Sequence, residues 1–455
     1  MIVLYSLLRP FSQIALNTFY RINVKGKERV PDNTPIIFAP SHSNGFIDPV
    51  ILGMQFYRRV RFFARGDVFK GKFAKFMLNQ MNTSPMYRMQ EGYAEIKKND
   101  KSFEECKTRL SKNEIILIYP EGIANHERRL FPLKKGLSRI ALQTLESLNY
   151  EKDILVVPIA MNYVAQTRFR SKVFIEVGEP ISVKSFETKY KLDKVRTINE
   201  FTKNLEEKLL GYVHHINNPD NDQLVADIEE VYTVQLLKEK ELNVKMLVNQ
   251  AVATGEIIKM VNVLDVNKPE LVSSLKTKLR NYIELLTQNQ LRDHLLREES
   301  INKMNFGTFI LEYLIIYLGM PIYLIGLLLN FPPYYLAKNL ADKKIKKAEF
   351  YASFRANLSM IFWTVYFLIQ VVILLLLFKS WWLLVLHTCV VAFTGFFVIK
   401  YYSVMKKIFG RWRLLRMVRK DKKTVEQLVN ERSAIMTMLE NAYLEYSALK
   451  IDESK

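Results

Sequence analysis

Apolar residues between Val24 and about Ser185 come in short runs, and stretches with helical spacing separate these runs. Strands that alternate with helices are typical of an α/β fold with a mainly parallel sheet flanked by helices. We therefore predict an α/β domain over residues 24–216, ahead of a cluster of turn-forming residues at 217–222. Its expected strands are residues 35–39, 60–64, 115–119, 154–159 and 173–177, and its clearest helices are residues 100–111 and 135–148.

Beyond the turn cluster the periodicity is helical. Residues 223–304 are expected to form an α-helical extension, and residues 424–449 an amphipathic helix with one broad apolar face. At the other end of the chain, residues 1–23 have the spacing of an amphipathic helix, which either lies on a bilayer or packs as an ordinary helix. This segment lacks the basic start and unbroken apolar block of a secretory signal.

Two long apolar segments, residues 358–378 and 381–399, lie between the extension and the last helix. Each is long enough to cross about 30 Å of hydrocarbon as a helix. Only Lys379 and Ser380 separate them, so we predict a transmembrane helical hairpin over residues 358–400.

An earlier apolar segment, residues 306–336, is interrupted by Glu312 and by Gly319-Met320-Pro321. A central proline breaks the hydrogen-bond ladder of a helix. We expect a re-entrant or interfacial hairpin here, with a single kinked membrane span as the alternative.

The charge distribution supports the hairpin. The chain has a formal net charge of +20, and its basic residues concentrate beside the apolar segments, with six Lys/Arg in residues 331–356 and ten in residues 400–423. Basic flanks stay on the cytoplasmic side, and a re-entrant segment followed by a hairpin keeps both flanks there. Membrane lipid therefore explains the charge better than nucleic acid does, and we expect no nucleic-acid partner. Two cysteines and six scattered histidines favour neither a disulfide scaffold nor a metal site.

The first segment whose side chains could take part in catalysis is Ser41–Pro49, which follows a predicted strand. Parallel sheets bind ligands at the carboxyl ends of their strands, and a histidine with a nearby carboxylate, here His42 and Asp48, can act as a general base. Taken alone, a capping histidine beside an unrelated acid is the simpler interpretation.

Three further segments carry groups suited to anions. Met86-Tyr87-Arg88 offers a guanidinium fork, Tyr119-Pro120-Glu121-Gly122 a glycine turn after a strand, and Lys134-Lys135-Gly136 a basic helix N-terminus. Each alone is equally an ordinary surface residue, β-turn or solvated charge pair. Residues 156–159 indicate a buried strand with no chemistry of its own.

In this order and spacing the segments resemble the glycerolipid acyltransferase family, the PlsC-type glycerol-3-phosphate and 1-acylglycerol-3-phosphate acyltransferases, over about residues 20–185. The His/Asp block of the family resembles His42 and Asp48, its arginine block Pro85–Arg88, and its Pro-Glu-Gly block residues 120–122. The helical extension and carboxyl-terminal membrane segments resemble the fungal glycerol-3-phosphate acyltransferase branch and related bacterial proteins.

The resemblance implies transfer of a fatty acyl group from an acyl thioester to a hydroxyl of glycerol-3-phosphate or 1-acylglycerol-3-phosphate, in phospholipid synthesis at a membrane. His42 is then the general base and Asp48 orients it. No metal or cofactor is implied, and the co-substrate is acyl-CoA or an acyl-carrier-protein thioester. An integral membrane protein with its catalytic domain on the cytoplasmic side is expected. The implied substrate-binding residues are Asn44, Gly45, Arg88, Glu121, Gly122, Lys134 and Lys135.

Two departures from the family pattern stand out. Five residues separate His42 from Asp48 where the family usually has four, so the extra residue must be absorbed in the loop, at Gly45. Ile123-Ala124 replaces the Thr-Arg that usually follows Pro-Glu-Gly, so a phosphate contact must come from elsewhere. A lipid hydrolase on the same fold and a non-catalytic lipid-binding or scaffold protein are the alternatives; the first lacks a Gly-x-Ser-x-Gly nucleophile, and the second leaves His42 unused.

Overall fold

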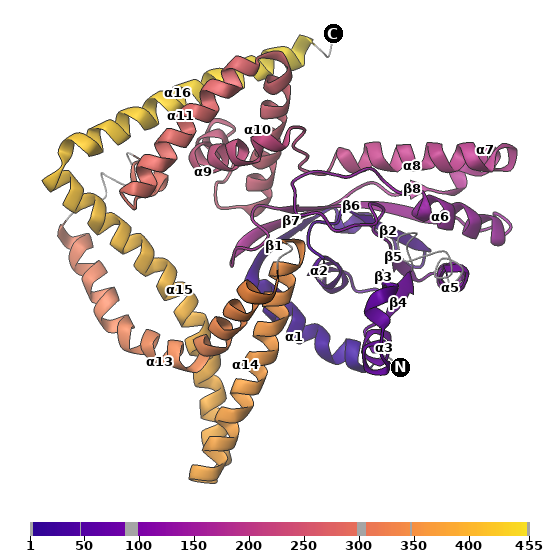
Figure 1. The fold of residues 1–455 in the computed structure, drawn as a ribbon, viewed down its shortest axis with the longest axis horizontal. Helices are drawn as coiled ribbons and strands as arrows, with labels where there is room; N and C mark the ends of the chain where they lie inside the picture. The colour runs from indigo at the N-terminus through magenta and orange to yellow at the C-terminus, as the bar shows by residue number, and fades with distance from the viewer. Residues whose placement is uncertain (1–2, 46, 87–98, 298–305, 346–347, 453–455) are drawn as a thin grey trace. The chain divides into compact units, whose positions relative to one another are not determined.

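The computed structural model describes residues 3–45, 47–86, 99–297, 306–345 and 348–452 (Figure 1). The chain divides into two compact units. The amino-terminal unit comprises residues 1–217 with 347–353, and the carboxyl-terminal unit comprises residues 218–346 with 354–455. The division at residue 217 falls within the predicted turn cluster.

An eight-stranded sheet forms the centre of the amino-terminal unit, in the order β1-β7-β6-β2-β5-β3-β4, with β8 paired to β6. Strands β2 to β6 run parallel to one another, whereas β7 and β8 pair antiparallel to β6 and β1 pairs parallel to β7. The predicted mainly parallel sheet is therefore confirmed. The strands are β1 Tyr20–Lys25, β2 Ile36–Pro40, β3 Val60–Arg65, β4 Thr83–Met86, β5 Ile115–Leu117, β6 Leu155–Tyr163, β7 Ser171–Val177 and β8 Ile181–Ser182.

Helices cover both faces of this sheet because its central strands are apolar on both sides. In β2, Ile37 and Ala39 join a buried cluster with residues of α5, α6 and α8, whereas Phe38 packs on Phe56 with ring centroids 4.6 Å apart. The helices of this unit are α1 Val3–Phe19, α2 Ile47–Gln55, α3 Lys72–Gln80, α5 Asn99–Ser111, α6 Gly136–Ser147, α7 Glu187–Leu192 and α8 Lys194–Leu210.

Two strands have weak sequence signals. β1 is only partly buried along its length, and β4 contains Pro85, which suits an edge strand. The amino-terminal helix ends at Phe19, so the first strand begins before the boundary predicted at residue 24.

In the carboxyl-terminal unit, the extension and the last helix pack together although about 130 residues separate them. α16 packs on α9, α10 and α11, and the apolar face predicted for it is buried at Val425, Leu428, Ile435, Leu439 and Ala442. Pro269 begins α11 at the position where proline is tolerated. The helices are α9 Asp222–Glu239, α10 Leu247–Asn267, α11 Pro269–Gln288 and α16 Lys422–Asp452.

A buried ionic cluster joins α11 to α16. The Asp293 carboxylate is 1% exposed and accepts hydrogen bonds from Arg432 Nε (2.8 Å), Tyr282 Oη (3.1 Å) and Arg297 Nη2 (3.2 Å). Removing one partner of a buried ion pair leaves an uncompensated charge.

We expect Asp293→Ala to lower the free energy of unfolding by about 3–5 kcal/mol, because it strands Arg432 and Arg297. Thermal and denaturant unfolding of the purified protein would measure this. Glu284→Ala is the control, because it removes only the exposed Arg280–Glu284 pair (3.1 Å) and should cost less than about 1 kcal/mol. Equal losses in the two variants would show that the cluster does not stabilise the bundle.

Among the described residues, three helices are long and apolar enough to cross a membrane: α13 Phe306–Lys344, α14 Ala348–Phe378 and α15 Trp381–Lys420. Residues 379–380 join α14 to α15, as the predicted hairpin requires. α13 and α15 pack antiparallel: Glu312 pairs with Arg411 and with Trp412 Nε1 (2.9 Å), and Gly326 lies against Thr394 and Val398.

The predicted helix break at Pro321 is wrong, because α13 continues through it. α15 packs against this part of α13. The Tyr401 hydroxyl donates to the Ile316 carbonyl (2.6 Å), next to the Tyr317 carbonyl that Pro321 leaves without its usual N–H donor, and Gly319 has no side chain to hold the Tyr401 ring away.

α14 compensates for two further prolines of α13. Pro332 and Pro333 lack the N–H groups that would bond the carbonyls four residues earlier, those of Leu328 and Leu329. Tyr366 Oη donates to the first carbonyl (2.9 Å) and Gln370 Nε2 to the second (3.2 Å). Figure 1 shows α13 bending, so that its first part follows α15 and its second part approaches α14.

Candidate active site

The sheet brings two of the predicted segments together. β2 and β5 are parallel neighbours, with Phe38 opposite Leu117, so the segments after their carboxyl ends meet at one edge. These segments are Ser41–Pro49 and Tyr119–Gly122. The Asn125 N–H donates to the His42 carbonyl (2.8 Å) and links the loop after β5 to the loop after β2.

His42 and Asp48 are in contact. His42 Nδ1 lies 3.1 Å from Asp48 Oδ2, and the same oxygen accepts the backbone N–H groups of Ser43 (2.9 Å) and Asn44 (2.7 Å). Ser43, Asn44 and Gly45 lie in the segment before α2, which begins at Ile47, and Asp48 lies in the first turn of that helix. The imidazole thus has a carboxylate at Nδ1, which leaves Nε2 to exchange a proton with a substrate.

Tyrosines that the sequence analysis missed surround Asp48. Tyr163, at the end of β6, donates its hydroxyl to Asp48 Oδ1, and Tyr20 Oη accepts a hydrogen bond from Asn44 Nδ2 (3.3 Å). The strand predicted to carry no chemistry therefore reaches the site, because β6 continues four residues beyond the predicted end at Ile159. Asn44 is 1% exposed and these contacts are internal, so its role toward substrate stays a prediction.

Tyr119 stacks on His42, with ring centroids 3.7 Å apart and an interplanar angle of 17°. Such stacking limits rotation of the imidazole about its side-chain bonds. Burial, followed by the charge of Asp48, raises the pKa of Tyr119 and of Tyr163, so both are neutral phenols at pH 7. The aromatic residue directly before Pro-Glu-Gly was the available sequence signal.

Glu121 links the loop after β2 to the loop between β5 and α6. Its side chain is 2% exposed, Oε1 accepts the His42 N–H (2.8 Å), and Oε2 accepts the Phe131 N–H (3.0 Å). Burial raises the pKa of Glu121 to about 7, and the two N–H donors only partly offset this. A substrate-binding role of Glu121 stays a prediction.

The raised pKa of Glu121 predicts a stability change with pH. The folded state holds this proton more tightly than the unfolded state, so stability should fall as pH rises from about 4.5 to about 7, by up to about 3 kcal/mol. Unfolding of wild type and Glu121→Gln at pH 5 and pH 8 isolates this contribution as a difference. The exposed Glu151→Gln is the control and should retain the wild-type dependence; equal dependence in Glu121→Gln would contradict the prediction.

Gly122 and Lys134 lie together. Gly122 has φ +71°, which favours glycine, and a Cβ there would lie 3.5 Å from Lys134 Cγ; the Lys134 N–H donates to the Pro120 carbonyl (2.7 Å). The Gly122 N–H already donates to the Tyr119 carbonyl (3.1 Å), so an oxyanion donor at this turn must be another group. The side chains of Lys134 and Lys135 are exposed, and α6 begins directly after them, as expected for an anion site at a helix N-terminus.

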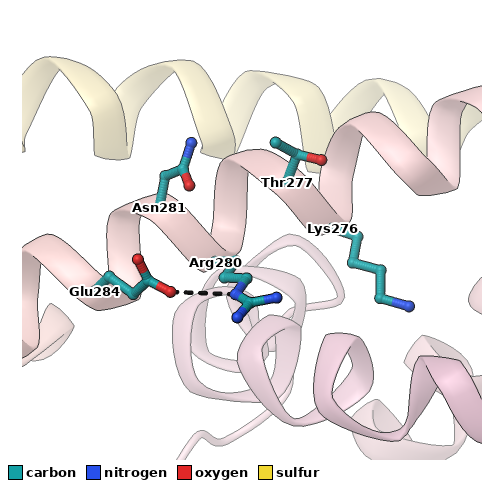
Figure 2. Close-up of a pocket in the computed structure, with 5 residues that line it drawn as sticks. All are labelled: Lys276, Thr277, Arg280, Asn281 and Glu284. Atoms are coloured by element: carbon teal, nitrogen blue, oxygen red, sulfur yellow. Dashed lines mark hydrogen bonds and ion pairs between the residues drawn. The ribbon is translucent and has the colours of Figure 1, made fainter.

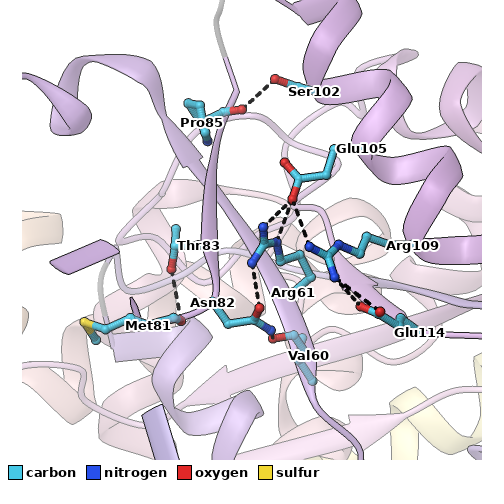
Figure 3. A network of polar contacts seen from close by, with 10 residues as sticks. All are labelled: Val60, Arg61, Met81, Asn82, Thr83, Pro85, Ser102, Glu105, Arg109 and Glu114. Carbon is cyan, nitrogen blue, oxygen red and sulfur yellow. Dashed lines mark hydrogen bonds and ion pairs between the residues drawn. The ribbon is translucent and has the colours of Figure 1, made fainter. Parts of the chain in front are cut away.

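For two of the predicted substrate-binding residues, Gly45 and Arg88, the structure adds little about their role. Gly45 is half-buried in the loop before α2, and Arg88 lies outside the described residues. The strand that leads to Arg88 is held firmly (Figure 3): Arg61 of β3 bonds Glu105 of α5 through Nε (3.0 Å) and Asn82 Oδ1 through Nη1 (2.7 Å). Burial alone would raise the pKa of Glu105, but hydrogen bonds from Arg61 and Ser84 outweigh it and lower that pKa.

Two other features do not extend this site. A hollow on α11, in the carboxyl-terminal unit, is lined by Lys276, Thr277, Arg280, Asn281 and Glu284 and contains none of the predicted residues (Figure 2). The described residues contain no group of three or more His, Cys, Asp or Glu side chains able to hold a metal ion.

Residues 21–162 match the family model described as Acyltransferase. This part of the chain is therefore similar to the Acyltransferase family. The matched region contains His42, Asp48, the Pro-Glu-Gly turn and both lysines that follow it, so the predicted chemistry and the family match coincide in one region.

Several proteins similar to this chain are named as acyltransferases of glycerolipid synthesis. Glycerol-3-phosphate O-acyltransferase 1 of Saccharomyces cerevisiae is 24% identical over 244 residues, which is 52% of this chain and 31% of that protein. The chloroplastic 1-acyl-sn-glycerol-3-phosphate acyltransferase LPAT1 of Arabidopsis thaliana is 24% identical over 152 residues, 33% of this chain and 38% of that protein. The matched region is thus about a third of each relative. The crystal structure of the acyltransferase PlsC from Thermotoga maritima aligns at a TM-score of 0.32 and 20% identity, over 45% of this chain and 78% of that one.

Proposed function

We propose that this protein transfers a fatty acyl group from an acyl thioester to a hydroxyl of glycerol-3-phosphate at a membrane surface. The observation that carries the proposal is the His42–Asp48 pair beside the Pro-Glu-Gly turn, in the region that matches the Acyltransferase family. Membrane helices in the same chain suit a lipid product.

In this mechanism His42 Nε2 removes the proton of the acceptor hydroxyl, while Asp48 accepts the hydrogen bond from Nδ1 and stabilises the imidazolium. The acceptor oxygen attacks the thioester carbonyl, so a C–O bond forms and the C–S bond breaks. The thiolate leaves and takes the proton back from His42. Acyl-CoA and acyl-carrier protein both supply the required thioester, and the reaction needs no covalent enzyme intermediate.

Glycerol-3-phosphate is favoured over 1-acylglycerol-3-phosphate as acceptor because the match to the yeast protein of that name is longer, 244 residues against 152. The test is an acceptor panel with purified protein, one labelled acyl thioester and, in turn, glycerol-3-phosphate, 1-acylglycerol-3-phosphate, glycerol and water. We expect labelled lysophosphatidate. Release of free fatty acid alone would indicate a hydrolase, and no turnover with any acceptor or donor would favour a lipid-binding protein.

We propose that Arg88 binds the acceptor phosphate, together with Lys134 or Lys135 from the loop before α6. Arg88→Ala should then raise the acceptor KM about ten- to a hundredfold, because a hydrogen bond to a charged group contributes about 1.5–3 kcal/mol. Steady-state kinetics with each substrate varied separately would measure this, and Arg59→Ala, an exposed arginine on the loop before β3, is the control. A change confined to the donor KM would assign Arg88 another role.

A further inference from the structure

The two oxygens of Asp48 have different partners. Oδ2 accepts hydrogen bonds from His42 Nδ1 (3.1 Å) and from the Ser43 and Asn44 N–H groups, all on its own side of the loop. Oδ1 accepts the hydroxyl of Tyr163, which comes from β6, 115 residues away in the chain. Asp48 is completely buried, so water does not replace a missing donor at either oxygen.

Tyr163 is itself fixed from several sides. It is 6% exposed, lies at the end of a strand that pairs with both β2 and β7, and packs edge-on against Tyr20 with ring centroids 5.7 Å apart. The sheet therefore fixes the position of the ring, and with it the position of the hydroxyl beside Asp48 Oδ1. A buried carboxylate that accepts four hydrogen bonds has a defined rotation as well as a defined position.

We propose that Tyr163 is a positioning residue of the acyl-transfer site: its hydroxyl holds Asp48 so that Oδ2 faces His42 and shares the carboxylate charge with the imidazole. This inference rests on the proposed function of His42 as the base. Without the hydroxyl, Oδ1 loses its donor inside the protein, and the carboxylate becomes more basic. A more basic Asp48 stabilises the imidazolium, so His42 should hold its proton to higher pH and become a poorer base at neutral pH.

Other titratable groups face the His42–Asp48 pair. They are Tyr20 of β1, Tyr119 and Glu121 after β5, and Tyr163 of β6. The phenols stay neutral in the working range, whereas Glu121 titrates near neutrality. Because Glu121 is present in wild type and variant alike, the difference between their titration curves reports Tyr163.

The experiment measures the protonation of His42 directly. Diethyl pyrocarbonate acylates neutral imidazole, and mass spectrometry of the peptide that contains His42 gives its modification rate at each pH; the side chain is 12% exposed. In Tyr163→Phe we expect the midpoint for His42 to rise by about 0.5–1 unit. At pH 7, kcat should fall by up to about three- to tenfold, with both KM values unchanged.

The matched control is Tyr190→Phe, which removes the hydroxyl of another buried tyrosine of the same unit, in a cluster away from His42. It should leave the midpoint and kcat unchanged. If Tyr163→Phe fails to fold, trifluorotyrosine at position 163 keeps the ring and the hydrogen bond but makes the hydroxyl a stronger donor, so the midpoint should fall.

An unchanged His42 midpoint in both Tyr163 variants would overturn the inference. So would a shift of equal size in Tyr190→Phe, because the effect would then not be specific to Asp48. The modification assay does not depend on turnover. If wild type transfers no acyl group, the proposed function fails while the assay still decides whether Tyr163 acts on His42 through Asp48.

Discussion

Replacing His42 with alanine should lower acyl transfer by at least about 10²–10⁴-fold, the range expected when a general base is lost. In the proposed mechanism the imidazole takes the acceptor proton, and its geometry is set by Asp48, Tyr119 and the Glu121 contact to its backbone. The measurement is initial rate with saturating acyl thioester and glycerol-3-phosphate, together with a thermal melt. The fold should survive, because the side chain is partly exposed and Asp48 keeps three other donors.

Two variants make this test specific. Asp48→Asn keeps the shape of the side chain but no longer stabilises the imidazolium, so we expect a loss of similar order. His214→Ala removes a half-buried histidine of the same unit that lies against Phe174, with ring centroids 6.4 Å apart, and should retain most activity. Near-normal turnover by His42→Ala, with the fold intact, would contradict the proposed role of His42 as the general base.

The parts of the site that could be predicted from sequence are local. His42 and Asp48 are six residues apart and follow an apolar run that almost any chain would bury as a strand, so their contact follows from short-range geometry. Both segments follow strands of a predicted parallel sheet, so they are expected at the same edge of that sheet. That β2 and β5 are direct neighbours, which places the Pro-Glu-Gly turn beside His42, comes from the structure.

The missed parts depend on contacts distant in sequence. Tyr163 bonds Asp48 across 115 residues, and nothing in the residues around Tyr163 indicates a hydroxyl acceptor at the end of its strand. The break expected at Pro321 rests on a local signal as well, whereas the structure keeps α13 helical through all three of its prolines. At Pro332 and Pro333 the donors to the freed carbonyls come from Tyr366 and Gln370 of α14, 38 and 41 residues from the carbonyls that they bond. In both cases the deciding contact lies far away in the sequence.

The topology prediction follows from the helical bundle of the carboxyl-terminal unit. α9 to α11 precede the three apolar helices, α16 follows them, and all four pack together with the buried Asp293–Arg432 pair between them. We therefore expect them to lie on one side of the membrane, with an even number of crossings in the chain between them. On this expectation one of the three apolar helices enters the membrane and returns to the same side.

α13 is the helix expected to return. Its first part runs antiparallel to α15. Further along, Pro332 and Pro333 leave the carbonyls of Leu328 and Leu329 without N–H donors from α13, and these carbonyls accept hydrogen bonds from Tyr366 and Gln370 of α14. A bend supported in this way permits both basic flanks, residues 331–356 and 400–423, to lie on the same side of the membrane as α9–α11 and α16, and the positive-inside rule predicts that this side is cytoplasmic. α14 and α15 then cross and return, with Lys379 and Ser380 on the far side.

Single cysteines in a Cys-free variant, labelled with a membrane-impermeant thiol reagent on intact cells, should give an all-or-none pattern. Ser380→Cys should label, whereas Lys343→Cys and Lys420→Cys, both at exposed positions, should label only after permeabilisation. A complete crossing by α13 gives the inverse pattern, with 343 and 420 labelled and 380 protected, because each later segment changes side. That inverse pattern would also separate α16 from α9–α11 across the bilayer, so it would contradict both the re-entrant helix and the bundle that requires it.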